Sequence, residues 1–115
     1  MTVRILHNPR CSKSRATLAL LQDRGIDPEI VLYLDTPPSI AELKDILKKL
    51  HMKPRDLMRR GEEEYTSLVL SDPDLSDEEL LNAMVSHPRL IERPIVLANN
   101  KAAIGRPPQA VLDVL

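Results

Sequence analysis

The order strand, helix, strand in the first 34 residues constrains the fold of this chain more than any other feature. Val3, Ile5 and Leu6 predict a short strand, and a breaker-rich loop follows it before a helical pattern begins at Cys11 or Ser12. That helix is predicted to stop at Gly25, a residue suited to the C-terminal cap. The continuous apolar run at residues 30–34 is typical of a central strand covered on both faces. Together the three elements predict a right-handed parallel crossover.

The middle of the chain, from about residue 39 to 87, has a helical pattern. A Ser-x-x-Glu capping box precedes an apolar face at helix spacing in two places: Ser39 with Glu42, and Ser76 with Glu79. Between the two boxes, Pro54 fits the first position of a short helix that ends near Gly61.

The last part of the chain predicts a β-hairpin followed by a helix. Apolar runs at residues 95–98 and 102–104 flank Asn99 and Asn100, a pair that tolerates the positive φ of tight turns. Pro107 then opens a final helix. The element order βαβ, helical insertion, ββα predicts an α/β fold with a thioredoxin-like mixed sheet.

Length and charge exclude several classes of protein. At 115 residues the chain is about the size of one domain, and we expect a single thioredoxin-like domain over residues 1–115 with a helical insertion at about 39–87. The net charge of -1 and the absence of Trp and Phe disfavour nucleic-acid binding and stacking on a ring cofactor. The apolar runs are too short for a membrane span, and basic residues interrupt any signal-peptide core. We therefore expect a cytoplasmic protein with no nucleic-acid or membrane partner.

Cys11 is the only cysteine, and it stands where the first helix is expected to begin. With three scattered histidines it cannot complete the ligand spacing of a structural zinc site, so we expect a free thiol and no metal. Backbone N–H groups at a helix start favour an anion, and residues 1–22 contain four basic residues and no acidic one. These features predict a thiolate that is nucleophilic near neutral pH. The alternative is a small buried hydrophobic residue.

Two polar residues near Cys11 are candidates for supporting the thiolate. Ser14 follows three residues later, so its hydroxyl is placed to donate a hydrogen bond to the sulfur. His7, when protonated, would stabilise the thiolate electrostatically. The alternatives are an ordinary first-turn serine and a packed or solvated histidine.

Three arginines stand beside chain breakers at predicted element boundaries, namely Arg59, Arg93 and Arg106. An arginine fork matches a tetrahedral oxyanion through two parallel hydrogen bonds, which suggests a phosphate-shaped or arsenate-shaped substrate. The alternative is that they are solvated arginines in surface salt bridges.

Several short motifs along the chain form a familiar set. They are His7-Asn8-Pro9-x-Cys11-x-x-Ser14-Arg15, Leu32-Tyr33-Leu34-x-x-Pro37-Pro38, Arg55-x-Leu57-x-Arg59, His87-Pro88 to Arg93-Pro94-Ile95-Val96, and Gly105-Arg106-Pro107 with Val111-Leu112-Asp113. In this respect the chain resembles the glutaredoxin-coupled arsenate reductases, the ArsC type, within the wider ArsC/Spx group of thioredoxin-like proteins. The resemblance covers essentially the whole length.

The resemblance implies a role for each candidate residue. Cys11 would be the nucleophile, His7 would help to lower its pKa, and Arg59, Arg93 and Arg106 would bind the oxyanion. It also implies a cis peptide bond between Arg93 and Pro94. Glutathione as co-substrate, followed by glutaredoxin, would supply the electrons, and no bound cofactor would be needed.

The chain departs from this group at two points. The arsenate reductases follow the cysteine with small neutral residues, whereas this chain has Ser12 and Lys13. Spx-type regulators commonly sense redox state through a Cys-x-x-Cys pair, and Ser14 replaces the second cysteine here, which excludes such a switch. Three hypotheses follow: an arsenate reductase, a glutathione-dependent monothiol-glutaredoxin-like protein without arsenate activity, and a non-catalytic regulator that binds RNA polymerase.

Overall fold

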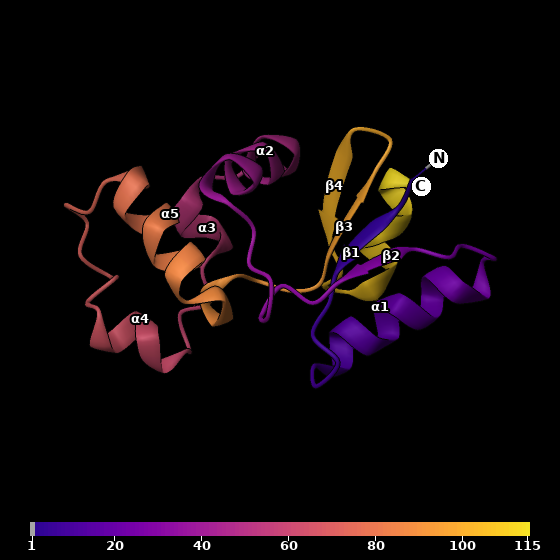
Figure 1. Ribbon diagram of the computed structural model, residues 1–115, viewed down its shortest axis with the longest axis horizontal. Coiled ribbons are helices and arrows are strands. Elements are labelled where there is room, and N and C mark those ends of the chain that lie inside the picture. The colour runs from indigo at the N-terminus through magenta and orange to yellow at the C-terminus, as the bar shows by residue number, and fades with distance from the viewer. Residues whose placement is uncertain (1) are drawn as a thin grey trace. The chain divides into compact units, whose positions relative to one another are not determined.

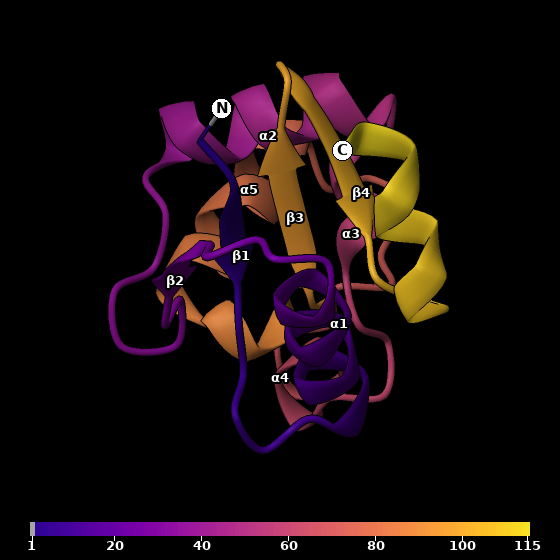
Figure 2. The same cartoon turned by 90° about the vertical axis from the view of Figure 1, so that its right-hand side faces the viewer.

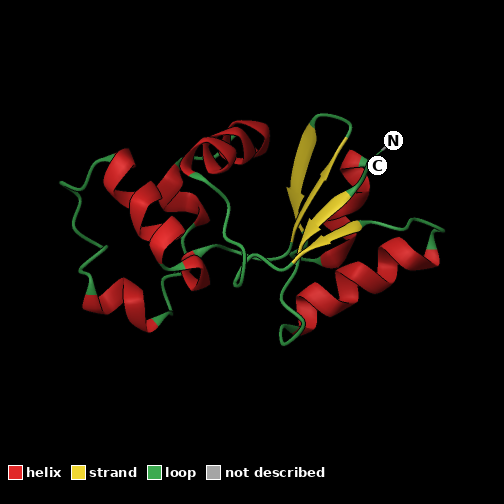
Figure 3. Ribbon diagram, in the orientation of Figure 1, coloured by secondary structure: helices red, strands yellow, loops and turns green. Residues whose placement is uncertain are grey.

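The computed structural model describes residues 2–115, and the chain divides into two compact units. The first unit runs to Thr36 and resumes at Arg93–Leu115, and the second is Pro37–Glu92. Figures 1 and 3 show that the strands of the described residues lie in the first unit, whereas the second is built from helices and loops. No helix within residues 2–115 is long and apolar enough to cross a membrane.

The first unit contains a four-stranded mixed sheet. Its strands are β1 (Arg4–Leu6), β2 (Glu29–Val31), β3 (Ile95–Ala98) and β4 (Lys101–Ile104). Figure 2 shows their order, β2-β1-β3-β4, in which β1 is parallel to β2 and antiparallel to β3. Because Leu6 pairs with Ile95, and Ile95 with Ile104, the end of β1, the start of β3 and the end of β4 meet at one end of the sheet. The loops that emerge there carry the candidate site.

Two helices, α1 (Ser12–Asp23) and η2 (Pro108–Val114), pack together and cover one face of this sheet (Figures 1 and 2). The core between them is aliphatic and includes Val3, Ile5, Leu21, Val96, Ala98, Val111 and Val114. Within this set Val96 and Ala98 are two residues apart on β3, as expected for side chains on one face of a pleated sheet, and Ile5 is on β1. Burial of this apolar surface holds α1, and with it Cys11, against the sheet.

The predicted central strand at residues 30–34 is wrong. β2 covers only Glu29–Val31 and lies at the edge of the sheet, paired with β1 alone. The chain then turns, because the Leu32 carbonyl accepts the N–H groups of Asp35 and Thr36. Ile30 and Leu32 remain 46% and 41% exposed, so the apolar run did not signal burial on both faces.

The second unit contains α2 (Ile40–Leu50), α3 (Pro54–Leu57), α4 (Glu63–Ser67), α5 (Asp77–Ser86) and the short 3-10 helix η1 (Pro88–Leu90). The capping box of Ser39 and Glu42 is confirmed, with bonds of 3.1 and 3.4 Å. The helix begun by Pro54 ends at Leu57 rather than near Gly61, because Met58 is extended and bridges to Ile91.

The C-terminal hairpin is also confirmed. Asn99 and Asn100 have φ values of 54° and 61°, and both conformations are tolerated by Asn better than by most residues. The final helix differs from the prediction in type, since η2 is a 3-10 helix and Pro107 caps it. Cis peptide bonds precede Pro94 and Pro107. The mixed sheet and this element order confirm the predicted α/β fold; a single domain with an insertion stays a prediction.

Candidate active site

Cys11 is the N-cap residue of α1 and has an extended backbone, with φ -93° and ψ 123°. Its side chain is buried, and its N–H donates to the Asn8 carbonyl at 3.0 Å. No side chain caps α1 by a hydrogen bond, and its first turn contains no acidic residue. The first N–H groups of the helix, which have no partner within it, are therefore directed toward the thiol rather than toward a capping side chain.

The pKa of Cys11 is lowered from its ordinary value by the sum of opposing effects. Burial is the largest single effect and raises it, because a thiolate is poorly solvated there. The backbone N–H groups of Ser14 and Lys13 and the Arg93 guanidinium donate hydrogen bonds to the sulfur, and together they outweigh burial. The thiol is therefore easier to ionise than a free cysteine.

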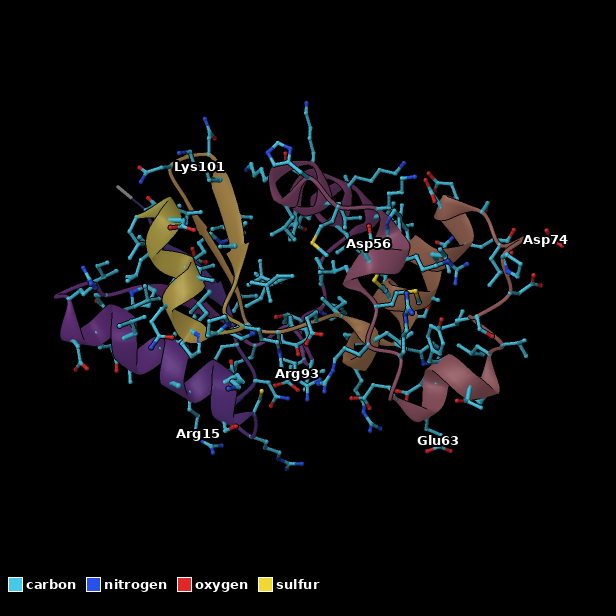
Figure 4. All side chains as sticks on the ribbon, turned by 180° about the vertical axis from the view of Figure 1, so that it is seen from behind. Arg15, Asp56, Glu63, Asp74, Arg93 and Lys101 are labelled. Carbon is cyan, nitrogen blue, oxygen red and sulfur yellow. The ribbon has the colours of Figure 1, made fainter. Side chains whose placement is uncertain are left out.

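Arg93 and Arg106 bring two guanidinium groups to Cys11 from the open end of the β3–β4 hairpin, where Arg93 precedes β3 and Arg106 follows β4. Arg106 Nη2 lies 3.7 Å from Cys11 Sγ, and Arg106 Nε donates to the Arg93 carbonyl at 2.9 Å. Figure 4 marks Arg93 in the loop before β3, and Lys101 at the opposite end of the hairpin. The roles of Arg93 and Arg106 in oxyanion binding stay predictions.

Ser14 and His7 form a buried polar pair. Ser14 Oγ lies 2.7 Å from His7 Nδ1 and accepts the N–H of Asn8 at 3.0 Å. The side chain of Ser14 is thus engaged with the loop, while its backbone N–H bonds to the sulfur. The predicted bond from its hydroxyl to the thiolate stays a prediction.

The pKa of His7 is lowered, first by burial and then by the positive charge of Arg15. Lowering the pKa of a histidine favours its neutral form at pH 7. Protonated His7 as electrostatic support for the thiolate stays a prediction, whereas its hydrogen bond with Ser14 gives it a positioning role in the structure.

Asn8 organises the loop before Cys11, a role that the motif analysis did not assign to it. Its Oδ1 accepts the N–H of Arg10 at 3.0 Å, its carbonyl accepts the N–H of Cys11, and its N–H donates to Ser14. Arg15 Nη1 adds a bond of 2.9 Å to the Pro9 carbonyl. An Asn-Pro pair directly before a helix is a known signal for such a side-chain turn. These bonds hold the loop in the shape that presents the thiol.

Arg59 lies in the second unit, after α3. Its N–H donates to the Leu90 carbonyl at 2.7 Å, and its guanidinium lies 3.5 Å from Glu62 and 3.7 Å from Glu92. An oxyanion at Arg59 would compete with these carboxylates. Its predicted role in oxyanion binding stays a prediction. Among residues 2–115 no group of three or more His, Cys, Asp and Glu side chains could hold a metal ion.

The mixed sheet, with a buried cysteine at the open N-terminus of its first helix, defines a thioredoxin-like protein with an activated thiol. The model of the ArsC family matches residues 6–114. The chain belongs to the ArsC family.

Individual relatives agree with this assignment over their full lengths. The protein YfgD of Escherichia coli K12, which is described as uncharacterised, is 57% identical over 98% of this chain and 96% of its own. An arsenate reductase of Neisseria meningitidis serogroup A is 54% identical over 98% of this chain and 97% of its own. The solved structure of an arsenate reductase from Vibrio cholerae is 52% identical, with a TM-score of 0.97 over 100% of this chain and 98% of that one.

Proposed function

We propose that this protein reduces arsenate to arsenite with Cys11 as the nucleophile. The observation that carries the proposal is the Cys11 thiol at an uncapped helix start, with the Arg106 guanidinium 3.7 Å from its sulfur. The name arsenate reductase of the Neisseria and Vibrio relatives supports the choice of substrate.

Arg93 and Arg106 bind the oxyanion in this proposal. Their guanidinium groups lie beside the sulfur and carry positive charge where a tetrahedral oxyanion would approach. Such forks bind two oxygens at once, which orients the anion as well as attracting it. For Arg59 the same role rests on the resemblance alone.

In the first step the Cys11 thiolate forms a bond to arsenic. One As–O bond breaks, and the departing hydroxide takes up a proton to become water. Arsenic remains arsenic(V) at this stage. The lowered pKa of Cys11 increases the fraction of thiolate at neutral pH.

In the second step a glutathione thiolate attacks the Cys11 sulfur. The electron pair of the S–As bond stays on arsenic, which becomes arsenic(III) and leaves as arsenite, while Cys11 and glutathione form a mixed disulfide. A glutaredoxin thiolate then attacks the glutathione sulfur of this disulfide and releases Cys11 as a thiolate. An external thiol is required because the chain has one cysteine. The steps need no resident metal or organic cofactor.

The test is a coupled assay of NADPH oxidation with arsenate, glutathione, glutaredoxin and glutathione reductase. We expect turnover with the native chain and none with Cys11→Ser, since a serine hydroxyl of similar size is a far poorer nucleophile at neutral pH. Circular dichroism of the variant checks that the fold is intact. Turnover by a folded Cys11→Ser variant would show that the chemistry lies elsewhere.

A second substrate in the same assay separates the main alternative. A small glutathione mixed disulfide in place of arsenate is a substrate for a monothiol-glutaredoxin-like protein, which uses the same activated thiol. Turnover of that disulfide without turnover of arsenate would overturn the proposal and assign the alternative. Absence of both activities, together with binding to purified RNA polymerase, would favour the regulator.

A further inference from the structure

Gly105, between β4 and Arg106, occupies the most crowded glycine position in the chain. It is buried, and its N–H donates to the Pro94 carbonyl at 2.9 Å. A Cβ placed on it would collide with Thr17 Oγ1 and would lie 2.7 Å from Pro94 Cγ and 3.2 Å from Thr17 Cγ2. By contrast, a Cβ on Gly61 would meet no atom within 4 Å. Gly105 is therefore required for space and not for an unusual φ.

Neither neighbour of Gly105 can give way easily. Thr17 is fully buried, and its Oγ1 donates to the Lys13 carbonyl at 2.8 Å, which holds its rotamer. Pro94 is buried, and its carbonyl accepts the N–H of Gly105 itself, which restrains its backbone. A side chain at Gly105 would therefore move backbone, since interiors are packed too densely to absorb an extra methyl group.

The two neighbours belong to the elements that carry the candidate site. Thr17 is on α1, which begins with the residue after Cys11, and Pro94 directly follows Arg93. Gly105 itself precedes Arg106, which bonds to both the Arg93 carbonyl and the Cys11 sulfur. Three segments of the site thus meet at a point where only a hydrogen atom fits.

We propose that Gly105 is a positioning residue, whose missing side chain sets how closely Arg106 and Arg93 approach the Cys11 sulfur. The proposal deepens the proposed function and rests on it for the use of this geometry with arsenate. The distance of 3.7 Å between Arg106 Nη2 and Cys11 Sγ leaves little reserve, because a hydrogen bond weakens steeply as its donor and acceptor separate. A backbone shift of about 1 Å at Arg106 would break that contact.

The experiment measures alkylation of Cys11 by iodoacetamide as a function of pH in the native chain and in Gly105→Ala. We expect the midpoint to rise by about one pH unit, which corresponds to roughly tenfold slower alkylation at pH values well below both midpoints, because one charge-assisted bond to the thiolate is lost. Gly61→Ala is the matched control, with its midpoint unchanged. An unchanged midpoint in folded Gly105→Ala would overturn the proposal.

A second-site variant separates positioning from a general loss of packing. Thr17→Ala removes Thr17 Oγ1 and Cγ2, which are two of the three atoms nearest to the added methyl group; the third is Pro94 Cγ. The midpoint of the pair Gly105→Ala/Thr17→Ala is compared with that of Thr17→Ala alone. We expect this difference to be less than half of the difference between Gly105→Ala and the native chain. If Gly105→Ala does not fold, recovery of folding in the pair supports the proposal. A pair that stays unfolded, or that keeps the full shift, contradicts it.

These measurements contain no arsenate. A shifted midpoint in Gly105→Ala together with arsenate turnover by Cys11→Ser would uphold the positioning role and overturn the proposed function. An unshifted midpoint in Gly105→Ala, together with turnover that requires Cys11, would overturn the positioning role and uphold the proposed function.

Discussion

At Cys11, the burial that makes the thiolate costly also removes the water that would compete for it. A few donors then decide the balance, and in this site they are backbone N–H groups of α1 and the Arg93 and Arg106 guanidinium groups. Hydrogen bonds to a charged acceptor are stronger than neutral ones, so the loss of any one donor should be measurable.

Arg93→Lys keeps the positive charge but loses the fork. If Arg93 grips the oxyanion through two bonds, losing one of them removes roughly 1.5 to 3 kcal/mol, or about tenfold to a hundredfold in arsenate affinity. Arsenate titration measures the effect. Arg89→Lys is the control, because Arg89 is exposed and pairs with Glu62 in the second unit. Equal small effects at both positions would show that Arg93 does not bind the anion through a fork.

His7 predicts a dependence of stability on pH. Its pKa in the folded protein lies below the ordinary value of 6.5, so below that pH the unfolded chain binds more protons than the folded one. The free energy of unfolding should therefore fall as the pH drops through about 6.5. We expect a smaller fall in the free energy of unfolding for His7→Gln, measured by urea unfolding between about pH 7 and about pH 5. The exposed His51, changed to Asn, is the control, and a fall of equal size in His7→Gln and the native chain would refute the assignment.

Prediction from sequence reached the site partly for different reasons from those in the structure. The position of Cys11 at a helix start follows from element order and breakers, whereas Arg93 and Arg106 were candidates whose roles came from the resemblance. The backbone N–H groups at the helix start were predicted to stabilise the thiolate, and those of Ser14 and Lys13 lower the pKa of Cys11, but the hydrogen bond from Arg93 was not predicted from spacing. The contact between Ser14 and His7 depends on how the loop closes, which no spacing rule specifies.

At the scale of elements, local signals determined the outcome. α2 and α5 each begin after a serine whose side chain accepts an N–H of the first turn, and both starts were predicted from the sequence. α4 lacks a side-chain cap and any buried residue, so the sequence pattern could not reveal it. For β2 the sequence predicted too much structure. Its apolar run predicted burial on both faces, but burial depends on which strands become neighbours, and β2 lies at the edge of the sheet.

The hairpin turn between β3 and β4 predicts a stabilising substitution. Asn100 has a φ of 61°, a conformation that glycine adopts at lower cost, and Asn-Gly is the preferred pair for this turn. Asn100→Gly should raise the free energy of unfolding by about 0.5 kcal/mol, and Asn100→Val should lower it by about 1 kcal/mol or more. Urea unfolding measures both. Asn99 is kept, because its Nδ2 donates to the Val114 carbonyl at 2.9 Å. The reverse order of the two variants would refute the turn assignment.

At the scale of the whole molecule, the net charge hides a strong imbalance. Residues 1–22 hold four bases and no acid, so the remaining residues carry the acidic excess within a total of -1. Of the four bases, Arg10, Lys13 and Arg15 are exposed and lie close in sequence to Cys11. A local positive field of this kind attracts anions and is screened by salt over about 10 Å at 0.1 M ionic strength.

The kcat/KM for arsenate should therefore fall several-fold, on the order of known electrostatic steering effects, when the salt concentration is raised. The kcat should change less. Arg10→Gln/Lys13→Gln should reduce this dependence on salt. The matched control is Arg24→Gln/Lys101→Gln, which removes the same charge. Arg24 caps the far end of α1, about 18 Å along the helix from Cys11, and Lys101 is in the hairpin. An equal salt dependence in both pairs of variants would rule out a local field.

The register of β3 and β4 has an evolutionary consequence. Arg93 and Arg106 flank the paired ends Ile95 and Ile104, while the turn that joins the two strands lies at the other end (Figure 4). Insertions or deletions at that turn leave the open end of the hairpin unchanged, so the length of the turn is free to vary among homologues. A single residue inserted within β4 would reverse which face every following side chain occupies and would turn Arg106 away from the sulfur. Length variation among homologues should therefore concentrate at the turn and be purged from the strands.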